Sequence, residues 1–421
     1  MESEAIKAAV HILLNFAVIF IVGAFLAKLA DYIKVPDVAL FLLAGVFLGP
    51  SVLNLVSIPA DSTVNQLALT LGASVLLFQG GTEVRFSTLR QVWITLLLLS
   101  TVAVLGMVLI VGVTAHFVLG MSMVFAFLLA AIIAATDPAT LVPVFLSVKI
   151  KERLKQTVLS ESAFNDATAS IATFAILGII TTGQLSLSSI GLKLVIMAGG
   201  GIIIGAAYGL VGVFLVSNKT KYFLGQFTRL LLLPVIIGAY LTADHIGASG
   251  FMAVFVAGLI FANFDAFGWK MKEDTTEDIH TFIDTASLLL RITIFVLLGS
   301  NVNFGILLQN LGPGLIVIAV FMFIARPIVV LLCTLPDRKA KWQRNEILFM
   351  FWTRETGVIP AALAGMLLAM KIENAELISS IVFLAAFATI LIQATTTRFL
   401  AGRLNLLETG EHNHLEIKNE G

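Results

Sequence analysis

The sequence predicts an all-α protein that crosses a lipid bilayer many times. Of its 421 residues, 58% are hydrophobic and only 12% are charged, and the mean hydropathy is +1.00. A soluble domain would carry about 25% charged residues. The apolar residues form long stretches of the ~20 residues that a transmembrane helix needs. Two of these stretches are interrupted by polar residues and proline, as in helices that line a cavity within the membrane.

Composition also restricts the possible partners. The formal net charge is zero and the basic residues form no block, which argues against nucleic acid as a partner. The single cysteine, Cys333, lies in an apolar stretch, so we expect it to pack as a small hydrophobic residue. The first apolar stretch follows the acidic start MESEAIK, and we expect it to be retained instead of cleaved as a signal peptide.

The apolar stretches predict about thirteen transmembrane spans. They lie near residues 9–30, 36–53, 66–84, 91–117, 121–147, 157–181, 190–217, 226–244, 249–264, 281–300, 306–334, 346–370 and 376–399. We therefore expect residues 1–400 to form one transmembrane domain and residues 401–421 to form a short polar tail.

The distribution of basic residues predicts the orientation of these spans. With the N-terminus outside, nineteen of the 26 lysines and arginines fall in cytoplasmic segments. They are Lys28, Lys34, Arg85, Arg90, Lys149, Lys151, Arg153, Lys155, Lys219, Lys221, Lys270, Lys272, Arg338, Lys339, Lys341, Arg344, Arg398, Arg403 and Lys418. Because cytoplasmic loops are enriched in basic residues, we expect a cell-membrane protein with its N-terminus outside and its C-terminus in the cytoplasm.

Two spans are interrupted in a similar way. The fifth contains IIAATDPATLVPVF (residues 132–145) and the twelfth contains MFWTRETGVIPAAL (residues 350–363). Proline removes an amide donor and glycine weakens a helix, so both segments are predicted to unwind within the membrane. Unwinding exposes partial positive charge at helix N-termini and partial negative charge at C-termini. Asp137 is suited to the former and Arg354 to the latter.

The positions of the two interruptions favour an inverted repeat. The fifth and twelfth spans are seven helices apart, so they cross the membrane in opposite directions. Two six-helix units related by inversion place such broken helices across each other near the bilayer midplane, where transported ions bind. Two unrelated proline kinks are the alternative, but kinks alone would not need charged residues.

The seventh span carries a stripe of small residues. Gly201, Gly205 and Gly209 recur every fourth residue, which lets a neighbouring helix approach closely. We expect this face to pack inside the protein; a contact between two subunits is the alternative.

The sixth span carries polar residues that membrane helices rarely contain. In TVLSESAFNDATASI (residues 157–171), Ser162 and Asp166 share one helix face, and Glu161 and Asn165 share the adjacent face. A buried Glu161 needs a fixed counter-charge, and Arg326 in the eleventh span is the best candidate. An architectural ion pair is favoured over a direct role of these two residues in transport.

The other face of the sixth span predicts a cation site. Oxygen atoms of Asp166, Ser162, Thr136 and Asp137 can bind a dehydrated monovalent cation together with unwound carbonyls. Burial favours the neutral, protonated form of a carboxyl group, and a bound cation favours its ionised form. Competition of a proton and a cation for Asp166 is the chemistry of a proton-coupled cation exchanger.

At these residues the sequence resembles the monovalent cation:proton antiporter family, and specifically its NhaP and sodium/proton exchanger branch. The resemblance rests on ATDPA (135–139), ESAFND (161–166), Arg326 before a proline, and GASGFMAVFVAGLIFAN (247–263). It covers nearly the whole chain. The Asn-Asp pair in the context of Thr-Asp-Pro is its most specific element.

The resemblance implies a role for each site residue. Asp166 would carry the cation and the proton, Asn165 would hold the geometry of the site, and Glu161 and Arg326 would form the structural pair of the family. Asp137, Thr136 and Ser162 would be further ligands. Glu83 matches an acidic position along the ion route in some relatives, and a helix-end charge is an equally good interpretation.

The resemblance also implies an activity and an architecture. We expect electroneutral exchange of Na⁺ or Li⁺ for H⁺ by a homodimer that needs no cofactor. A core (91–181 and 306–399) would move against a scaffold (9–84 and 190–300) by alternating access. K⁺/H⁺ exchange is one alternative, and a gated cation channel or membrane sensor is another. An enzyme is least expected, because no nucleophile, metal or phosphate motif is present.

One residue departs from the pattern of the family. Relatives commonly have an Arg-Gly pair in the twelfth helix, whereas here Glu355 and Thr356 separate Arg354 from Gly357. The extra carboxylate either pairs locally with Arg354 or alters the ion preference, and the sequence does not decide between these. We also expect no nucleotide-binding domain after the last span, so that control of this kind would need a separate regulatory subunit.

Overall fold

The described part of the protein is helical, with one isolated bridge between Ile150 and Leu407. In this computed structural model, the described residues are 4–33, 35–136, 150–182 and 187–407. Eight helical segments within them are long and apolar enough to cross a membrane, and four shorter apolar helices accompany these. The all-helical, multi-pass fold class is confirmed, while the total of thirteen spans stays a prediction.

The helices follow the predicted spans closely. The first part of the chain forms α1 (Glu4–Ile33), α2 (Asp37–Leu48), α3 (Thr63–Thr82), α4 (Phe86–Ser100), α5 (Val102–Leu119), α6 (Met123–Ile133), α8 (Glu152–Thr182) and α9 (Leu187–Val216). The second part forms α10 (Thr228–His245), α11 (Gly250–Ala262), α12 (Glu273–Ser300), α13 (Phe304–Gln309), α14 (Leu311–Val320), α15 (Arg326–Thr334), α16 (Arg344–Trp352), α17 (Val358–Ala369), α18 (Ala375–Thr389) and α19 (Thr395–Arg403). The second half of the fifth predicted span lies outside the described residues.

The fourth predicted span is not one continuous helix. It divides into α4 and α5 at Thr101, whose backbone angles are φ −120° and ψ −69°. The hydroxyl groups of Ser100 and Thr101 both donate to the carbonyl oxygen of Leu97. Such bonds compete with the helical ladder and bend helices, which explains the break.

Two other predicted spans contain a π-helical turn, Phe321–Ala325 between α14 and α15 and Ile390–Ala394 between α18 and α19. The first precedes Pro327, which has no amide hydrogen to donate to the helical ladder. The second precedes Thr395 and Thr396, whose hydroxyls bond to the carbonyls of Leu391 and Ile392. Rearranged ladders of this kind are frequent at functional positions in helices.

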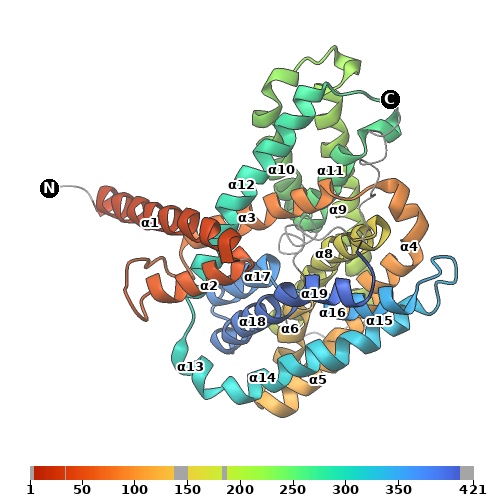
Figure 1. Cartoon of the computed structure of the whole chain (residues 1–421). Coiled ribbons are helices and arrows are strands. Elements are labelled where there is room, and N and C mark those ends of the chain that lie inside the picture. Colours follow the sequence, from red (N-terminus) through yellow and green to blue (C-terminus); the bar gives the residue numbers. More distant parts are fainter. Residues whose placement is uncertain (1–3, 34, 137–149, 183–186, 408–421) are drawn as a thin grey trace, which may run out of the picture.

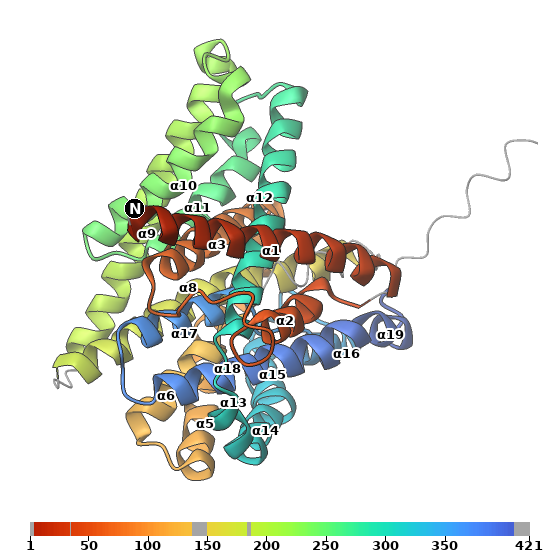
Figure 2. The same cartoon turned by 90° about the vertical axis from the view of Figure 1, so that its left-hand side faces the viewer.

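The helices gather into two groups. In both views, α10, α11 and α12 lie at the top of the molecule, while α5, α6, α14 and α18 lie at the bottom (Figure 1, Figure 2). Helix α11 packs mainly on α9 and α3, and α12 packs on α2 and α3, whereas α5 packs on α6, α14 and α15. Helix α8 contacts members of both groups, including α3, α4, α6, α9 and α17, so its residues lie at the junction.

The glycine stripe of α9 packs inside the protein, as predicted. A Cβ atom added at Gly205 would lie 2.2 Å from the carbonyl oxygen of Ala253 in α11. One added at Gly201 would lie 2.7 Å from the carbonyl oxygen of Ser249. Only glycine permits these approaches, so the stripe serves the α9–α11 contact within one chain.

Candidate functional site

The Ser162 and Asp166 face of α8 meets the end of α6. The backbone amide of Thr136 donates to Asp166 Oδ1 at 2.9 Å, and the Thr136 hydroxyl donates to Ser162 Oγ at 2.8 Å. Each of these three side chains is at most 3% exposed. The structure therefore brings together three of the four predicted cation ligands, and the fourth, Asp137, lies outside the described residues.

The local sequence explains why Thr136 has a free amide to donate. Helix α6 ends at Ile133, with Ala134 as its C-terminal cap, and Pro138 follows two residues after Thr136. A continuing helix would pair the Thr136 amide with the Ile132 carbonyl, but the helix ends at Ile133 and that carbonyl accepts from the Ala135 amide at 3.3 Å. The buried amide needs another acceptor, and Asp166 supplies it.

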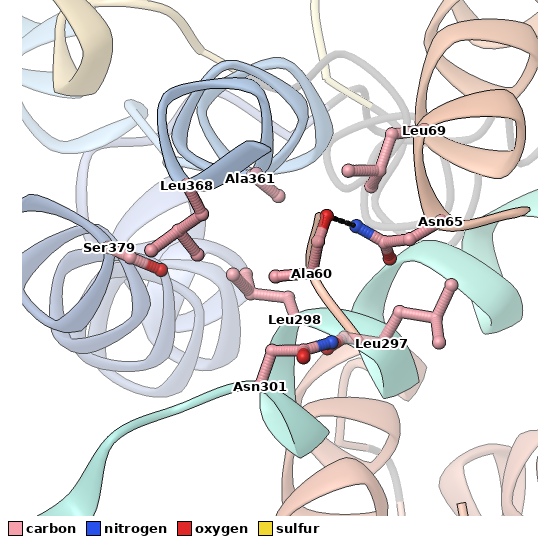
Figure 3. Close-up of a pocket in the computed structure, with 10 residues that line it drawn as sticks. Ala60, Asn65, Leu69, Leu297, Leu298, Asn301, Ala361, Leu368 and Ser379 are labelled. Carbon is pink, nitrogen blue, oxygen red and sulfur yellow. Dashed lines mark hydrogen bonds between the residues drawn. The ribbon is translucent and has the colours of Figure 1, made fainter. Parts of the chain in front are cut away.

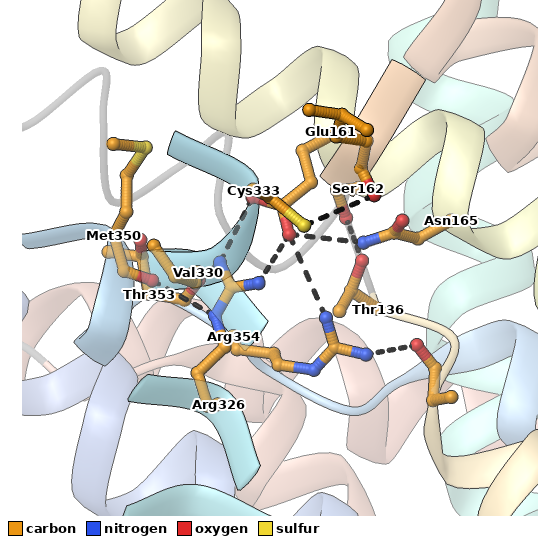
Figure 4. A network of polar contacts seen from close by, with 12 residues as sticks. Thr136, Glu161, Ser162, Asn165, Arg326, Val330, Cys333, Met350, Thr353 and Arg354 are labelled. Carbon is orange, nitrogen blue, oxygen red and sulfur yellow. Dashed lines mark hydrogen bonds and ion pairs between the residues drawn. The ribbon is translucent and has the colours of Figure 1, made fainter. Parts of the chain in front are cut away.

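The Glu161 and Asn165 face of α8 meets Arg326. The Arg326 guanidinium pairs with both carboxylate oxygens of Glu161, with 2.9 Å between Nη2 and Oε2 (Figure 4). The amide Nδ2 of Asn165 donates to Glu161 Oε1 at 3.2 Å. Arg326 and Glu161 are 1% and 2% exposed, so each charge depends on the other for compensation.

Arg326 also holds the second broken helix. Its Nε donates to the carbonyl oxygen of Met350 at 3.0 Å and its Nη2 to that of Thr353 at 3.4 Å. Both carbonyls lie at the end of α16, which is followed by the non-helical segment 353–357 and by α17. The predicted interruption of the twelfth span is thus confirmed, and the arginine compensates carbonyls that lose their helical partners.

Arg354 connects the two interruptions. Its Nη2 donates to the carbonyl oxygen of Ala134 at the end of α6, and its Nη1 lies 3.8 Å from Glu161 Oε1 (Figure 4). The guanidinium also lies 5.5 Å from the ring centroid of Phe321. A cation at the C-terminal end of a helix is favoured by the helix dipole, which is the position expected for Arg354.

Glu355 is fully buried, with 0% exposure. The Arg354 side chain beside it contacts Ala134, Glu161 and Phe321 within the described residues. None of these described contacts of Arg354 is with Glu355, and both interpretations of Glu355 from the sequence stay open. The next residue is fixed as well, because the Thr356 amide donates to Thr389 Oγ1 at 3.0 Å.

Glu83 lies apart from this network. It follows the last residue of α3 as its C-terminal cap and is half-buried. Its neighbour Arg85 donates to the carbonyl oxygen of Ala262, and Asn263 accepts from the amide of Phe86 at 2.8 Å. Among the described contacts of the network around α8, none involves Glu83, so the two interpretations of this residue stay open.

Several contacts had no signal in the sequence. These are the bonds of Arg326 to two carbonyls of α16, the Arg354 contact with Phe321, and the bond from Thr356 to Thr389. All of them join residues far apart in the chain through backbone atoms or ordinary apolar side chains. Periodicity and motifs carry no information about such partners.

A small cavity elsewhere has a different chemistry. It lies between α3, α12, α17 and α18 and has a volume of about 10 Å³ (Figure 3), which is about enough for one water. Its lining contains no charged residue; the polar members are Asn65, Asn301 and Ser379. Gln66 Nε2 bonds to the carbonyl oxygen of Gly365 nearby, at 3.1 Å. The cavity is a packing feature and has no acid to bind a cation.

The network around α8 is therefore the candidate ion site. It combines a buried carboxylate, two hydroxyl groups and the unwound end of a helix, the oxygen donors that suit a hard monovalent cation. The described residues hold no group of three or more His, Cys, Asp or Glu side chains arranged to bind a metal ion.

Comparison with known proteins agrees with this chemistry. A family model described as "Sodium/hydrogen exchanger, transmembrane" matches residues 17–403. Na(+)/H(+) antiporter 1 of Methanocaldococcus jannaschii is 31% identical and covers 93% of this chain and 94% of its own. The K(+)/H(+) antiporter NhaP of Alkalimonas amylolytica is 26% identical, over 96% of this chain and 68% of its own.

A solved structure has the same fold. The sodium proton antiporter MjNhaP1 from Methanocaldococcus jannaschii, determined at pH 8, matches with a TM-score of 0.79 and 28% identity. The match covers 94% of this chain and 99% of that one. With the family match over most of the sequence and a relative above 30% identity, this chain belongs to the sodium/hydrogen exchanger family of multi-pass membrane antiporters.

Proposed function

We propose that this protein exchanges one Na⁺ or Li⁺ for one H⁺ across the cell membrane, and that both ions compete for Asp166. The observation that carries this proposal is the place of Asp166, 1% exposed and bonded to the Thr136 amide at the end of α6. A buried carboxyl group is stable as a neutral acid or as an anion beside a cation. Either occupant satisfies the site, and the empty charged state is disfavoured.

Two further described residues contribute oxygen atoms to the proposed cation site. The hydroxyls of Thr136 and Ser162 lie 2.8 Å apart between α6 and α8 and supply neutral oxygens beside Asp166. Asp137 is proposed as an additional ligand from its place in the sequence. Asn165 donates to Glu161, and we assign it the role of holding the geometry of the site.

The charge balance supports an electroneutral exchange. Arg326 compensates the charge of Glu161 through two hydrogen bonds, so Glu161 has no need of a transported ion. Asn165 is neutral at the position next to Asp166. One carboxylate that alternates between one cation and one proton moves no net charge.

The packing supports alternating access. Helices α5, α6, α14 and α15 form one group and α9, α11, α12 and α3 another, with α8 at their junction. We assign the core to residues 91–181 and 306–399 and the scaffold to residues 9–84 and 190–300. Movement of the first against the second would expose Asp166 to one side of the membrane at a time. We propose that the N-terminus lies outside, that the C-terminus lies in the cytoplasm and that the protein is a homodimer, as expected from the sequence.

The test is exchange in sealed vesicles that contain the purified protein. Addition of Na⁺ to vesicles with an imposed proton gradient should collapse that gradient. Asp166→Asn should abolish this activity, because an asparagine oxygen can accept from the Thr136 amide, but the side chain neither takes up nor releases a proton under the same conditions. Asp244→Asn, which alters an exposed acid at the end of α10, is the control and should be active. Persistent exchange by Asp166→Asn would remove Asp166 from its role.

K⁺/H⁺ exchange is the second candidate. It is favoured by the similarity to a relative that is named a K(+)/H(+) antiporter, and oxygen ligands alone do not fix which monovalent cation binds. Vesicle assays with Li⁺, Na⁺ and K⁺ at several pH values decide between the two. The same vesicles test a cation channel, since a channel gives a voltage-dependent current and an electroneutral exchanger gives none.

A further inference from the structure

The exposed charged side chains of the loop between α15 and α16 are all basic. This basic loop, residues 336–343, exposes Arg338, Lys339 and Lys341, and Arg344 follows it as the first residue of α16. Its one acid, Asp337, is only 4% exposed. The exposed charged side chains of residues 336–343 are therefore all positive.

The shape of the basic loop is fixed by the buried acid. Asp337 Oδ1 accepts from the amides of Lys339 and Ala340 at 3.2 and 3.1 Å, and Oδ2 accepts from the amide and hydroxyl of Thr95 at 3.1 and 2.7 Å. Burial disfavours the charged form, but these four bonds outweigh it and hold the pKa of Asp337 below its usual value. The loop is thus folded around a permanent internal anion at neutral pH.

A tryptophan fixes the other end of the loop. Trp342 Nε1 donates to Thr95 Oγ1 at 2.9 Å, and the Arg153 guanidinium lies 4.5 Å from the centroid of the Trp342 ring. Arg153 Nη1 also donates to the carbonyl oxygen of Ala340 at 2.7 Å, and its Nη2 pairs with Glu346 at 2.8 Å. The loop is joined in this way to α4, α8 and α16.

The basic loop begins where an apolar surface ends. Leu331, Leu332 and Leu335, at the end of α15, are 40%, 60% and 68% exposed. In a membrane-spanning chain such side chains face the acyl chains of lipids, and the charged residues that follow them lie at headgroup depth. Tryptophan is itself enriched at this boundary.

We propose that the basic loop binds the headgroups of anionic phospholipids. Acyl chains would pack on the exposed leucines of α15, and the phosphate groups would contact Arg338, Lys339 and Lys341. A loop that only directs topology needs positive charge but no fixed conformation, whereas this one uses four hydrogen bonds and a buried acid to hold its shape. The adjoining leucines favour a lipid over free phosphate.

The test is lipid binding to the purified full chain, measured by native mass spectrometry after addition of phosphatidylglycerol or phosphatidylcholine. The native protein should retain phosphatidylglycerol in preference. Arg338→Gln/Lys339→Gln/Lys341→Gln should weaken this binding by about 100-fold, because a basic residue near an anionic surface contributes about 1 kcal/mol and 1.4 kcal/mol is tenfold.

The matched control removes three exposed lysines from the other helix group. Lys219→Gln/Lys221→Gln/Lys270→Gln has the same change in net charge and should bind phosphatidylglycerol as the native protein does. Equal loss in both triple variants would reduce the effect to net charge and overturn the proposal. Competition by inorganic phosphate at similar concentrations would overturn it in favour of a free anion. Because the readout is binding, the result is independent of whether Asp166 carries the transported ions.

Discussion

The two polar faces of α8 carry similar residues but meet different partners. On one face, Glu161 accepts two hydrogen bonds from Arg326 and one from Asn165. On the other, Asp166 accepts from the neutral amide of Thr136, and Ser162 accepts from the Thr136 hydroxyl. Both carboxylates are at most 2% exposed, so burial does not distinguish them.

The difference lies in what each face can exchange. The counter-charge of Glu161 is the side chain of Arg326 in α15, which cannot leave the site. Loss of the Glu161 charge would leave an unpaired arginine in the membrane interior. The amide and hydroxyl groups near Asp166 stabilise a carboxylate or a cation complex without adding a fixed charge. A buried acid paired with an arginine by two hydrogen bonds is thus suited to architecture, and we propose that Asp166, whose described hydrogen bond comes from a backbone amide, is suited to ion exchange.

The largest expected effect comes from breaking the paired face. Glu161→Gln should destabilise the protein by about 3–5 kcal/mol, because it leaves Arg326 charged, buried and uncompensated. Thermal unfolding of the purified protein in detergent measures the loss.

The control for this experiment neutralises both partners. Glu161→Gln/Arg326→Gln removes the two hydrogen-bonded charges together and should recover part of the stability, while Arg354, whose Nη1 lies 3.8 Å from Glu161 Oε1, keeps its charge. If the double variant were no more stable than the single one, the pair would not be the reason for the loss.

The next largest effect is expected on the face of α8 that carries Ser162 and Asp166. Ser162→Ala removes the acceptor of the Thr136 hydroxyl and one neutral oxygen of the proposed site. We expect the cation concentration at half-maximal exchange to rise about fivefold, since one hydrogen bond contributes about 1 kcal/mol. The loss of stability should be about 1 kcal/mol, as for the removal of any single hydrogen bond. A large loss of stability with an unchanged half-maximal cation concentration would assign Ser162 a structural role instead of a role in cation binding.

The smallest effect is expected at Asn165. Asn165→Ala removes its bond to Glu161 Oε1, while both bonds from Arg326 to that carboxylate stay in place. The loss of stability should be about 1 kcal/mol, measured by thermal unfolding, and the half-maximal cation concentration should change less than in Ser162→Ala. The opposite order of the two variants would assign Asn165 to the ion site.

Hydropathy predicted most of the fold because the membrane acts on each segment separately. A run of about 20 apolar residues is helical in lipid whatever its neighbours are. The division of the fourth span at Thr101 was missed, since it depends on two hydroxyls that bond to one carbonyl. The π-helical turn before Arg326 was missed for a similar reason: proline predicts a disturbed ladder but not the form that the ladder takes.

The pairing of the α8 faces was partly predictable. Spacing alone separates Glu161 and Asn165 from Ser162 and Asp166, because residues four apart share a helix face. The assignment of Arg326 to Glu161 followed from the scarcity of buried arginines in apolar spans. The position of Arg354 on the Ala134 carbonyl agrees with the sign of the helix dipole. The partner of Glu355 could not be inferred from its position in the sequence.

The sequence by itself determined that this chain is a helical membrane protein with two interrupted spans and a charged segment between them. These properties follow from local composition, which the bilayer converts directly into helices. Only the tertiary structure decided which donors meet which acceptors: Thr136 with Asp166, Arg326 with the carbonyls of α16, and Arg354 with the end of α6. These contacts join the ends of different helices, and their distances depend on how the helices pack against one another.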